Sequence, residues 1–96
     1  MLTIVALDQQ ENFLQFLDPD LCTLEETIEY GGLRTLDFQY QFQDLSKDKR
    51  LFKKGNKLWV SGDENLTDCL YVIDTEVTND VYKGNYFKFE IEEALV

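Results

Sequence analysis

Alternation dominates the segment from Thr23 to Phe42, where apolar and polar residues take turns on both sides of a Gly-Gly pair. A period of two residues is typical of a β-strand with one buried face, and glycines between two such runs indicate a hairpin. The segment therefore predicts two antiparallel strands, joined by a tight loop, that bury one of their two faces.

The length of the hairpin loop decides which residues face each other. A two-residue turn at Gly31-Gly32 would place the two apolar rows on opposite faces, which a half-buried sheet cannot accept. We therefore expect a three-residue loop at positions 31–33, with a glycine in the left-handed conformation. The expected pairs are Ile28 with Leu36, Leu24 with Tyr40, Thr27 with Asp37, Glu25 with Gln39 and Glu29 with Thr35. This register puts most glutamates on the solvent face, sets no like charges opposite each other, and turns Glu26 inward opposite Phe38.

Further short strands and one helix are expected in the rest of the chain. Residues 44–54 predict the helix, with Asp44 or Ser46 as its N-cap and Gly55 at its end. The other strands are expected at residues 2–7, 13–17, 58–62 and 69–74, with one or two more in residues 75–96. The predicted fold is mainly β with a minor α part. It is one domain, residues 1–96, built as a small antiparallel β-barrel or a strongly bent sheet of about seven or eight short strands.

One predicted strand, residues 69–74, is apolar on both faces. Cys69, Tyr71 and Ile73 alternate with Leu70 and Val72. Such a strand needs cover on both sides, which either the helix or another chain must supply.

The composition excludes several classes of function. A net charge of −10 argues against binding a nucleic-acid backbone, because cationic side chains must replace the counterions there. The chain has no histidine, so the metal sites and catalytic triads that depend on histidine are absent. The oxygen-rich loop at 61–68 lacks the spacing of an EF-hand and is expected to be a turn. We therefore predict no catalytic residue, no metal site and no cofactor, and do not expect an enzyme.

The two cysteines and the N-terminus bear on the compartment. Cys22 and Cys69 lie in no CxxC motif, and we expect both to be free, buried thiols. The first ten residues have no basic region, and Asp8 interrupts the apolar run, so no signal peptide is expected.

Three features are candidate interface elements. Six of the nine basic residues fall in one short window and form either a docking surface for an acidic partner or a solvated helix. Trp59 shares its face with Lys57 and Ser61, which indicates either an interface or cover by the helix. Glu26 either reaches water at the open end of a barrel or pairs across an interface. The predicted interface set is Lys47, Lys49, Arg50, Lys53, Lys54, Lys57, Trp59 and Glu26.

The order and spacing of the segments resemble a known family. The strand pair at 7–17, the acidic strand at 25–31, the LDFQY strand at 36–40, the FKKGNKL step at 52–58 and the YVI strand at 71–73 follow one another. This succession is similar to the N-terminal region of phage minor structural proteins, the tail-associated hub and tail-endopeptidase family of siphovirus-like phages and prophages. The resemblance covers most of the chain, although each piece alone is a loose pattern of β-hairpins.

The resemblance implies a structural, non-catalytic role in the virion tail, assembled in the host cytoplasm. It implies a hub at the tail tip, usually trimeric, in which small β-barrels form a ring around the channel for DNA. The partners that it implies are further copies of the chain, the distal tail protein and the tape-measure protein, with no direct nucleic-acid binding and no membrane. Family members run for hundreds of residues, so we expect either an N-terminal domain of a longer chain or a small standalone relative.

Two other readings stay open. An acidic DNA-mimic inhibitor fits the size and the charge, although the six clustered cations would interrupt a continuous row of carboxylates. A small adaptor domain without any connection to tails fits the same composition. Salt-sensitive binding to a nuclease or a polymerase would favour the mimic, and binding to another tail protein would favour the hub.

Overall fold

Seven antiparallel strands form one strongly bent sheet in this computed structural model, which describes residues 1–28, 31–32, 34–62, 68–73 and 86–93. The strand order is β2-β1-β5-β6-β7-β4-β3. The strands are β1 (Thr3–Leu7), β2 (Phe13–Leu17), β3 (Cys22–Ile28), β4 (Arg34–Gln41), β5 (Lys57–Ser61), β6 (Cys69–Val72) and β7 (Tyr86–Glu93). The short helices are η1 (Pro19–Leu21), α1 (Leu45–Asp48) and η2 (Lys49–Phe52). The predicted mainly β fold with one short helix is confirmed, as a bent sheet rather than a closed barrel.

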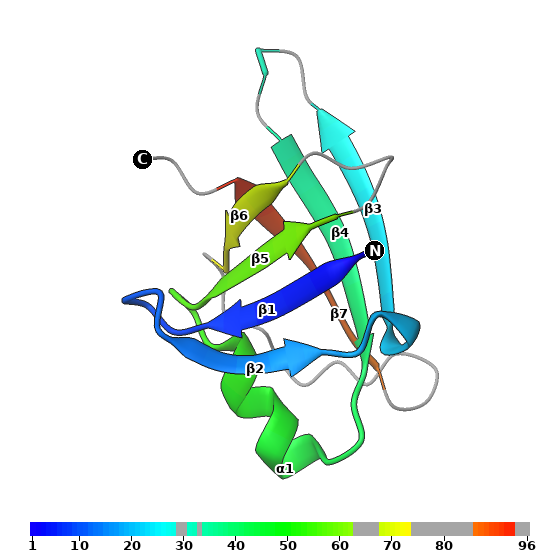
Figure 1. Cartoon of the computed structure of the whole chain (residues 1–96), viewed down its shortest axis with the longest axis vertical. Helices are drawn as coiled ribbons and strands as arrows, with labels where there is room; N and C mark the ends of the chain where they lie inside the picture. The colour runs from blue at the N-terminus through cyan, green and yellow to red at the C-terminus, as the bar shows by residue number, and fades with distance from the viewer. Residues whose placement is uncertain (29–30, 33, 63–67, 74–85, 94–96) are drawn as a thin grey trace.

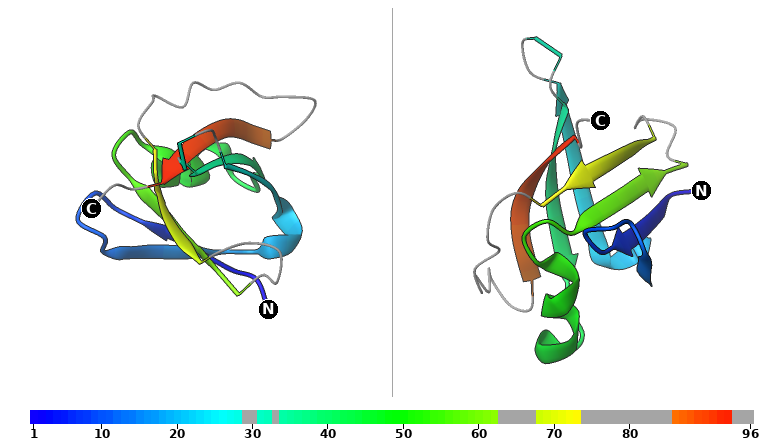
Figure 2. Two further views of the ribbon diagram at one scale, coloured as in Figure 1. Left: turned by 90° about the horizontal axis from the view of Figure 1, so that it is seen from above. Right: turned by 90° about the vertical axis from the view of Figure 1, so that its left-hand side faces the viewer.

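The sheet curls so that its two halves face each other across the core (Figure 1; Figure 2). We call strands β2-β1-β5-β6 the β1 half and strands β7-β4-β3 the β4 half. Among the described residues, the halves join at β6 and β7 through two residue pairs, Tyr71 with Glu93 and Val72 with Glu92. The outer strands β2 and β3 follow each other in sequence through η1, so the same short link connects both edges of the sheet.

Both halves contribute one inward row per strand to a shared core. The inward side chains of the β1 half include Ile4, Leu58 and Tyr71, and those of the β4 half include Leu36 and Phe38. All five are at most 1% exposed, as expected where alternating strands bury one face.

The helical segment closes one end of the curled sheet, at the bottom of Figure 1. Its Leu51 and Phe52 are buried, and the Phe52 ring lies 5.5 Å from that of Tyr40 and 6.0 Å from that of Phe38. The backbone N–H of Lys47 donates to the Asp44 carboxylate at 3.2 Å, so the predicted N-cap is confirmed at Asp44.

The hairpin register was predicted incorrectly. Leu24 pairs with Phe38 rather than Tyr40, and Ile28 pairs with Arg34 rather than Leu36. Thr27 faces Thr35 instead of Asp37, Glu26 faces Leu36 instead of Phe38, and Glu25 faces Asp37 instead of Gln39, whereas the pair expected for Glu29 lies outside the described residues. A shift by two residues keeps every side chain on its predicted face, so burial alone could not separate the two registers. Avoiding like charges at exposed positions is worth only tenths of a kcal/mol, which is too little to impose the other register.

Candidate interaction surfaces

The outer face of the β1 half is mostly apolar across four adjacent strands, with Lys57 as its one charged member among the eight aligned residues. Strand pairing aligns Phe16, Val5, Trp59 and Leu70 in one row, and Phe13, Leu7, Lys57 and Val72 in the next. Phe16 is 65% exposed, Phe13 57% and Trp59 37%, and the four aliphatic side chains between them are half-buried. We call this set of eight residues the aromatic face.

A β-bulge gathers the two phenylalanines on this face. Between Ala6 and Leu7 the pairing shifts, so that Leu7 lies opposite Phe13 instead of Leu14. The extra residue in β2 turns Phe13 to the same side as Phe16, against the strict alternation of a regular strand. The two rings meet edge to face, with centroids 5.0 Å apart.

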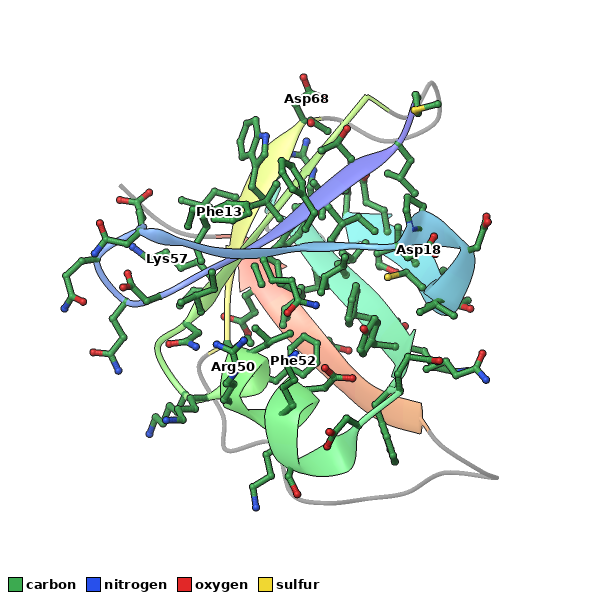
Figure 3. All side chains as sticks on the ribbon, turned by 60° about the horizontal axis from the view of Figure 1, so that its bottom comes forward. Phe13, Asp18, Arg50, Phe52, Lys57 and Asp68 are labelled. Atoms are coloured by element: carbon green, nitrogen blue, oxygen red, sulfur yellow. The ribbon has the colours of Figure 1, made fainter. Side chains whose placement is uncertain are left out.

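Carboxylates lie at both ends of the aromatic face. At one end Asp68 is exposed, and its Oδ1 accepts a hydrogen bond of 3.0 Å from the Gly62 N–H. At the other end lie Asp8 and Glu11, and the Lys57 ammonium stands 3.7 Å from the Glu11 carboxylate. Figure 3 shows Phe13, Lys57 and Asp68 over this side of the molecule, with Arg50 beside α1 at the far end.

The Asp8 carboxylate is held in its ionised form by the turn that follows β1. It accepts hydrogen bonds from the backbone N–H groups of Asn12 and Gln10 and from the Asn12 side chain. The backbone hydrogen bond from Asn12 is the main cause that lowers the pKa of Asp8, and the charge of Lys57 contributes further.

A row of carboxylates crosses the outer face of the β4 half. Glu25 lies opposite Asp37 and Asp37 opposite Glu90, so three exposed carboxylates form one row across β3, β4 and β7. We call these three residues the acidic row. In the described part of the chain, no group of acidic or cysteine side chains is arranged to hold a metal ion.

The structure divides the predicted basic cluster. Lys47, Lys49, Arg50, Lys53 and Lys54 are exposed on α1, η2 and the turn after them, and we call these five residues the basic end. Lys57 lies apart from them on the aromatic face, where it joins Trp59. The basic end is anchored through Asn56, whose side-chain amide donates to the carbonyl oxygens of Arg50 and Leu51 at 3.4 and 3.2 Å.

Glu26 points inward as predicted but finds its partner within the chain. Its Oε1 accepts a hydrogen bond from Arg34 Nε at 3.2 Å, and only 13% of the Glu26 side chain is exposed. Its Oε2 is buried without a hydrogen-bond partner among the described residues. The structure thus gives Glu26 an ion pair across β3 and β4, an arrangement that neither of its two predicted alternatives anticipated.

The cysteines are free thiols, with Cys69 buried and Cys22 partly exposed. Burial, together with the nearby Asp18 charge, raises the pKa of Cys22 to about 12. Cys22 is therefore a protonated thiol at neutral pH, a form with little nucleophilic character.

Sequence reasoning identified Trp59 and Lys57 for this surface but missed Phe13, Phe16 and the acidic row. The spacing of three between the two phenylalanines breaks strict alternation inside β2 and was the available signal for a bulge.

No helix in the described part of the chain is long and apolar enough to cross a membrane. Comparisons with protein-family models, with curated proteins and with solved structures found no match. The resemblance to tail hub proteins therefore stays a prediction.

Proposed function

We propose that this chain is a non-catalytic assembly domain of a phage or prophage tail tip, where copies of it form part of a ring around the tail channel. The order and spacing of its segments support the assignment to a tail, as argued from the sequence. The observation that carries the assembly role is the separation of charge between the basic end and the acidic row.

The two charged surfaces are complementary and accessible. The basic end presents five exposed cations at one end of the curled sheet, and the acidic row presents three exposed carboxylates on the outer face of the β4 half. The two surfaces lie on different elements, so contact between them in different copies is heterologous. Contacts of that kind build a ring when the rotation between copies closes.

The charge balance suits a position beside DNA in transit. With a net charge of −10, the domain repels a phosphate backbone, apart from the basic end that the neighbouring copy covers. A ring of such domains would let DNA pass without binding it.

Light scattering over a series of protein and salt concentrations tests the contact between copies. We expect an oligomer, a trimer in the simplest ring, that dissociates as salt rises because the contact is electrostatic. The Lys53→Glu plus Lys54→Glu variant should be monomeric, and so should the Glu25→Lys plus Asp37→Lys variant.

Mixing the two variants provides the control. The first variant keeps its acidic row and the second keeps its basic end, so a one-to-one mixture should form heterodimers. Mixed variants that stay monomeric, or single variants that still assemble, would refute the proposed contact.

Mass spectrometry of purified phage or induced prophage particles from the source organism tests the location in the tail. We expect peptides of this chain to co-purify with tail structures. Their absence from intact tails would overturn the assignment to the tail, whatever the oligomeric state of the isolated domain.

A further inference from the structure

The aromatic face is a surface that the proposed contact between copies leaves unused. The outer face of an antiparallel sheet in a small domain is usually polar, with apolar residues restricted to the inner face. Here Phe13, Phe16 and Trp59 together expose about 300 Å² of aromatic surface, and half-buried aliphatic side chains connect them. That area is comparable to the largest apolar patch on an ordinary monomer, which is often a functional surface.

The charges around the aromatic face define the chemistry of its partner. Carboxylates lie at both ends, Asp68 at one and Asp8 and Glu11 at the other. Of the two cations nearby, Lys57 is already paired with Glu11, and the N-terminal ammonium of Met1 donates to the Gly62 carbonyl oxygen at the Asp68 end. Asp8 is ionised at neutral pH like any exposed carboxylate, and the three hydrogen bonds that its turn donates lower its pKa further. The face is therefore an apolar strip between negative ends, which complements an apolar strip between positive ends.

A second copy of this chain does not fit that description. Two aromatic faces packed together would bring carboxylates of the same sign to both ends of the contact. The basic end of another copy supplies cations, but its apolar side chains Leu51 and Phe52 are at most 2% exposed and cannot reach a partner. Among the described residues, neither surface of a second copy fits the face, so we take the occupant to be a different protein.

The dimensions of the face select the shape of the occupant. Four strands at the usual spacing are roughly 14 Å across from first to last, and five-residue strands are about 17 Å long. One α-helix with its side chains is about 10 Å wide, and about eleven helical residues cover 17 Å. A single helix of about three turns fills the face.

We propose that the aromatic face binds an amphipathic helix of another protein, whose apolar side lies on Phe13, Phe16 and Trp59 and whose lysine or arginine side chains meet Asp68 at one end and Asp8 and Glu11 at the other. The proposal concerns a surface distinct from the basic end and the acidic row. Its outcome is therefore independent of whether copies of this chain form a ring.

The only tryptophan of the chain, Trp59, lies within the face and reports on its occupation. The probe is a synthetic amphipathic peptide of about fourteen leucine and lysine residues, with the leucines on one helical side. Titration at physiological salt should shift the Trp59 fluorescence to the blue and saturate. The same peptide with glutamate in place of lysine should bind at least about tenfold more weakly, because its ends would repel the carboxylates.

Two variants decide whether the aromatic face is the binding site. Phe16→Ser should weaken binding of the leucine-lysine peptide at least about tenfold, since Phe16 is the most exposed aromatic side chain of the face and buried aromatic anchors carry much of the energy of such contacts. Ile28→Ser is the matched control, because Ile28 is 60% exposed at the far end of β3, and this variant should bind like the parent chain. Circular dichroism should show both variants folded.

Three results would overturn the proposal. The first is equal affinity of the parent chain and the Phe16→Ser variant for the peptide, which would mean attraction by net charge alone. The second is equal affinity for the glutamate peptide. The third is an unchanged Trp59 spectrum with peptide but a blue shift with phosphatidylcholine vesicles, which would identify a lipid surface as the partner.

Discussion

The β1 half and the β4 half of the sheet bury the same kind of inner face and present opposite kinds of outer face to the solvent. In the β1 half, Phe16, Val5, Trp59 and Leu70 follow one another across the strands, whereas in the β4 half the corresponding positions are Glu25, Asp37 and Glu90. The core therefore depends on the inward residues alone. The outward residues of the β1 half are largely apolar, and those of the acidic row all carry the same charge. Neither arrangement stabilises the fold, so we interpret both as binding surfaces.

The largest expected effect tests whether both halves share one core. Leu58→Ala in the β1 half and Leu36→Ala in the β4 half should each lower the free energy of unfolding by about 3 kcal/mol, because both side chains are completely buried. Urea unfolding followed by circular dichroism measures this loss. A small effect in one half and a large effect in the other would show that the two halves do not unfold as one unit.

The second-largest effect is expected at the ion pair of Arg34 with Glu26 on the inner face of the β4 half. Arg34→Met removes the partner of the Glu26 carboxylate and should lower the free energy of unfolding by about 2 kcal/mol, less than for a fully buried pair because both side chains keep some exposure. The double variant Arg34→Met plus Glu26→Leu should recover most of that loss, since neither charge of the pair then remains at this position. Urea midpoints of the two variants give the comparison, and equal midpoints would contradict the explanation.

The acidic row predicts a gain of stability when its central charge is removed. Asp37→Asn should raise the free energy of unfolding by about 0.5 kcal/mol at low salt, because Asp37 faces a carboxylate on each side. High salt should reduce the gain by screening. A loss of stability at low salt would mean that the row is not repulsive within a single copy.

The smallest effect concerns the turn beside the aromatic face. The pKa of Asp8 is lowered in the folded state, so its contribution to stability is present above its usual pKa near 3.8 and is lost as the pH falls through the lower folded value. In the Asp8→Asn variant the free energy of unfolding should therefore fall less steeply as the pH drops below about 3.8, and it should be slightly lower than in the parent at neutral pH. Thermal unfolding between pH 2 and 7 measures both changes, and an acid profile identical to that of the parent would refute the assignment.

Alternation and turn residues were enough to predict the fold class, the helix near residues 44–54 and the inner face of the hairpin. For the strands these patterns were sufficient because burial alternates along the whole strand, so every residue of a strand supports the same assignment of its inner and outer faces. The hairpin register could not be predicted, because a shift by two residues preserves the faces, and because the diagonal pair of Glu26 with Arg34 becomes visible only in three dimensions.

The aromatic face was only partly predictable. Trp59 was recognised because its own strand alternates regularly, but Phe13 reaches the face through a bulge, which depends on how β2 pairs with β1. Likewise, the acidic row joins residues of three strands, and no single segment shows it. Surfaces of this kind depend on which strands become neighbours, and local patterns do not contain that information.

The strand order has a consequence for how the chain folds. The hairpin of β3 and β4 joins near neighbours in sequence and can form within microseconds. In contrast, β1 must find β5, pairing Thr3 with Ser61, and β4 must find β7, pairing Thr35 with Glu92. Closing such long loops costs entropy before any contact rewards it, so the complete sheet is expected to form in milliseconds to seconds. Because β7 lies between β6 and β4, its pairing with both strands is needed before the two halves become one sheet.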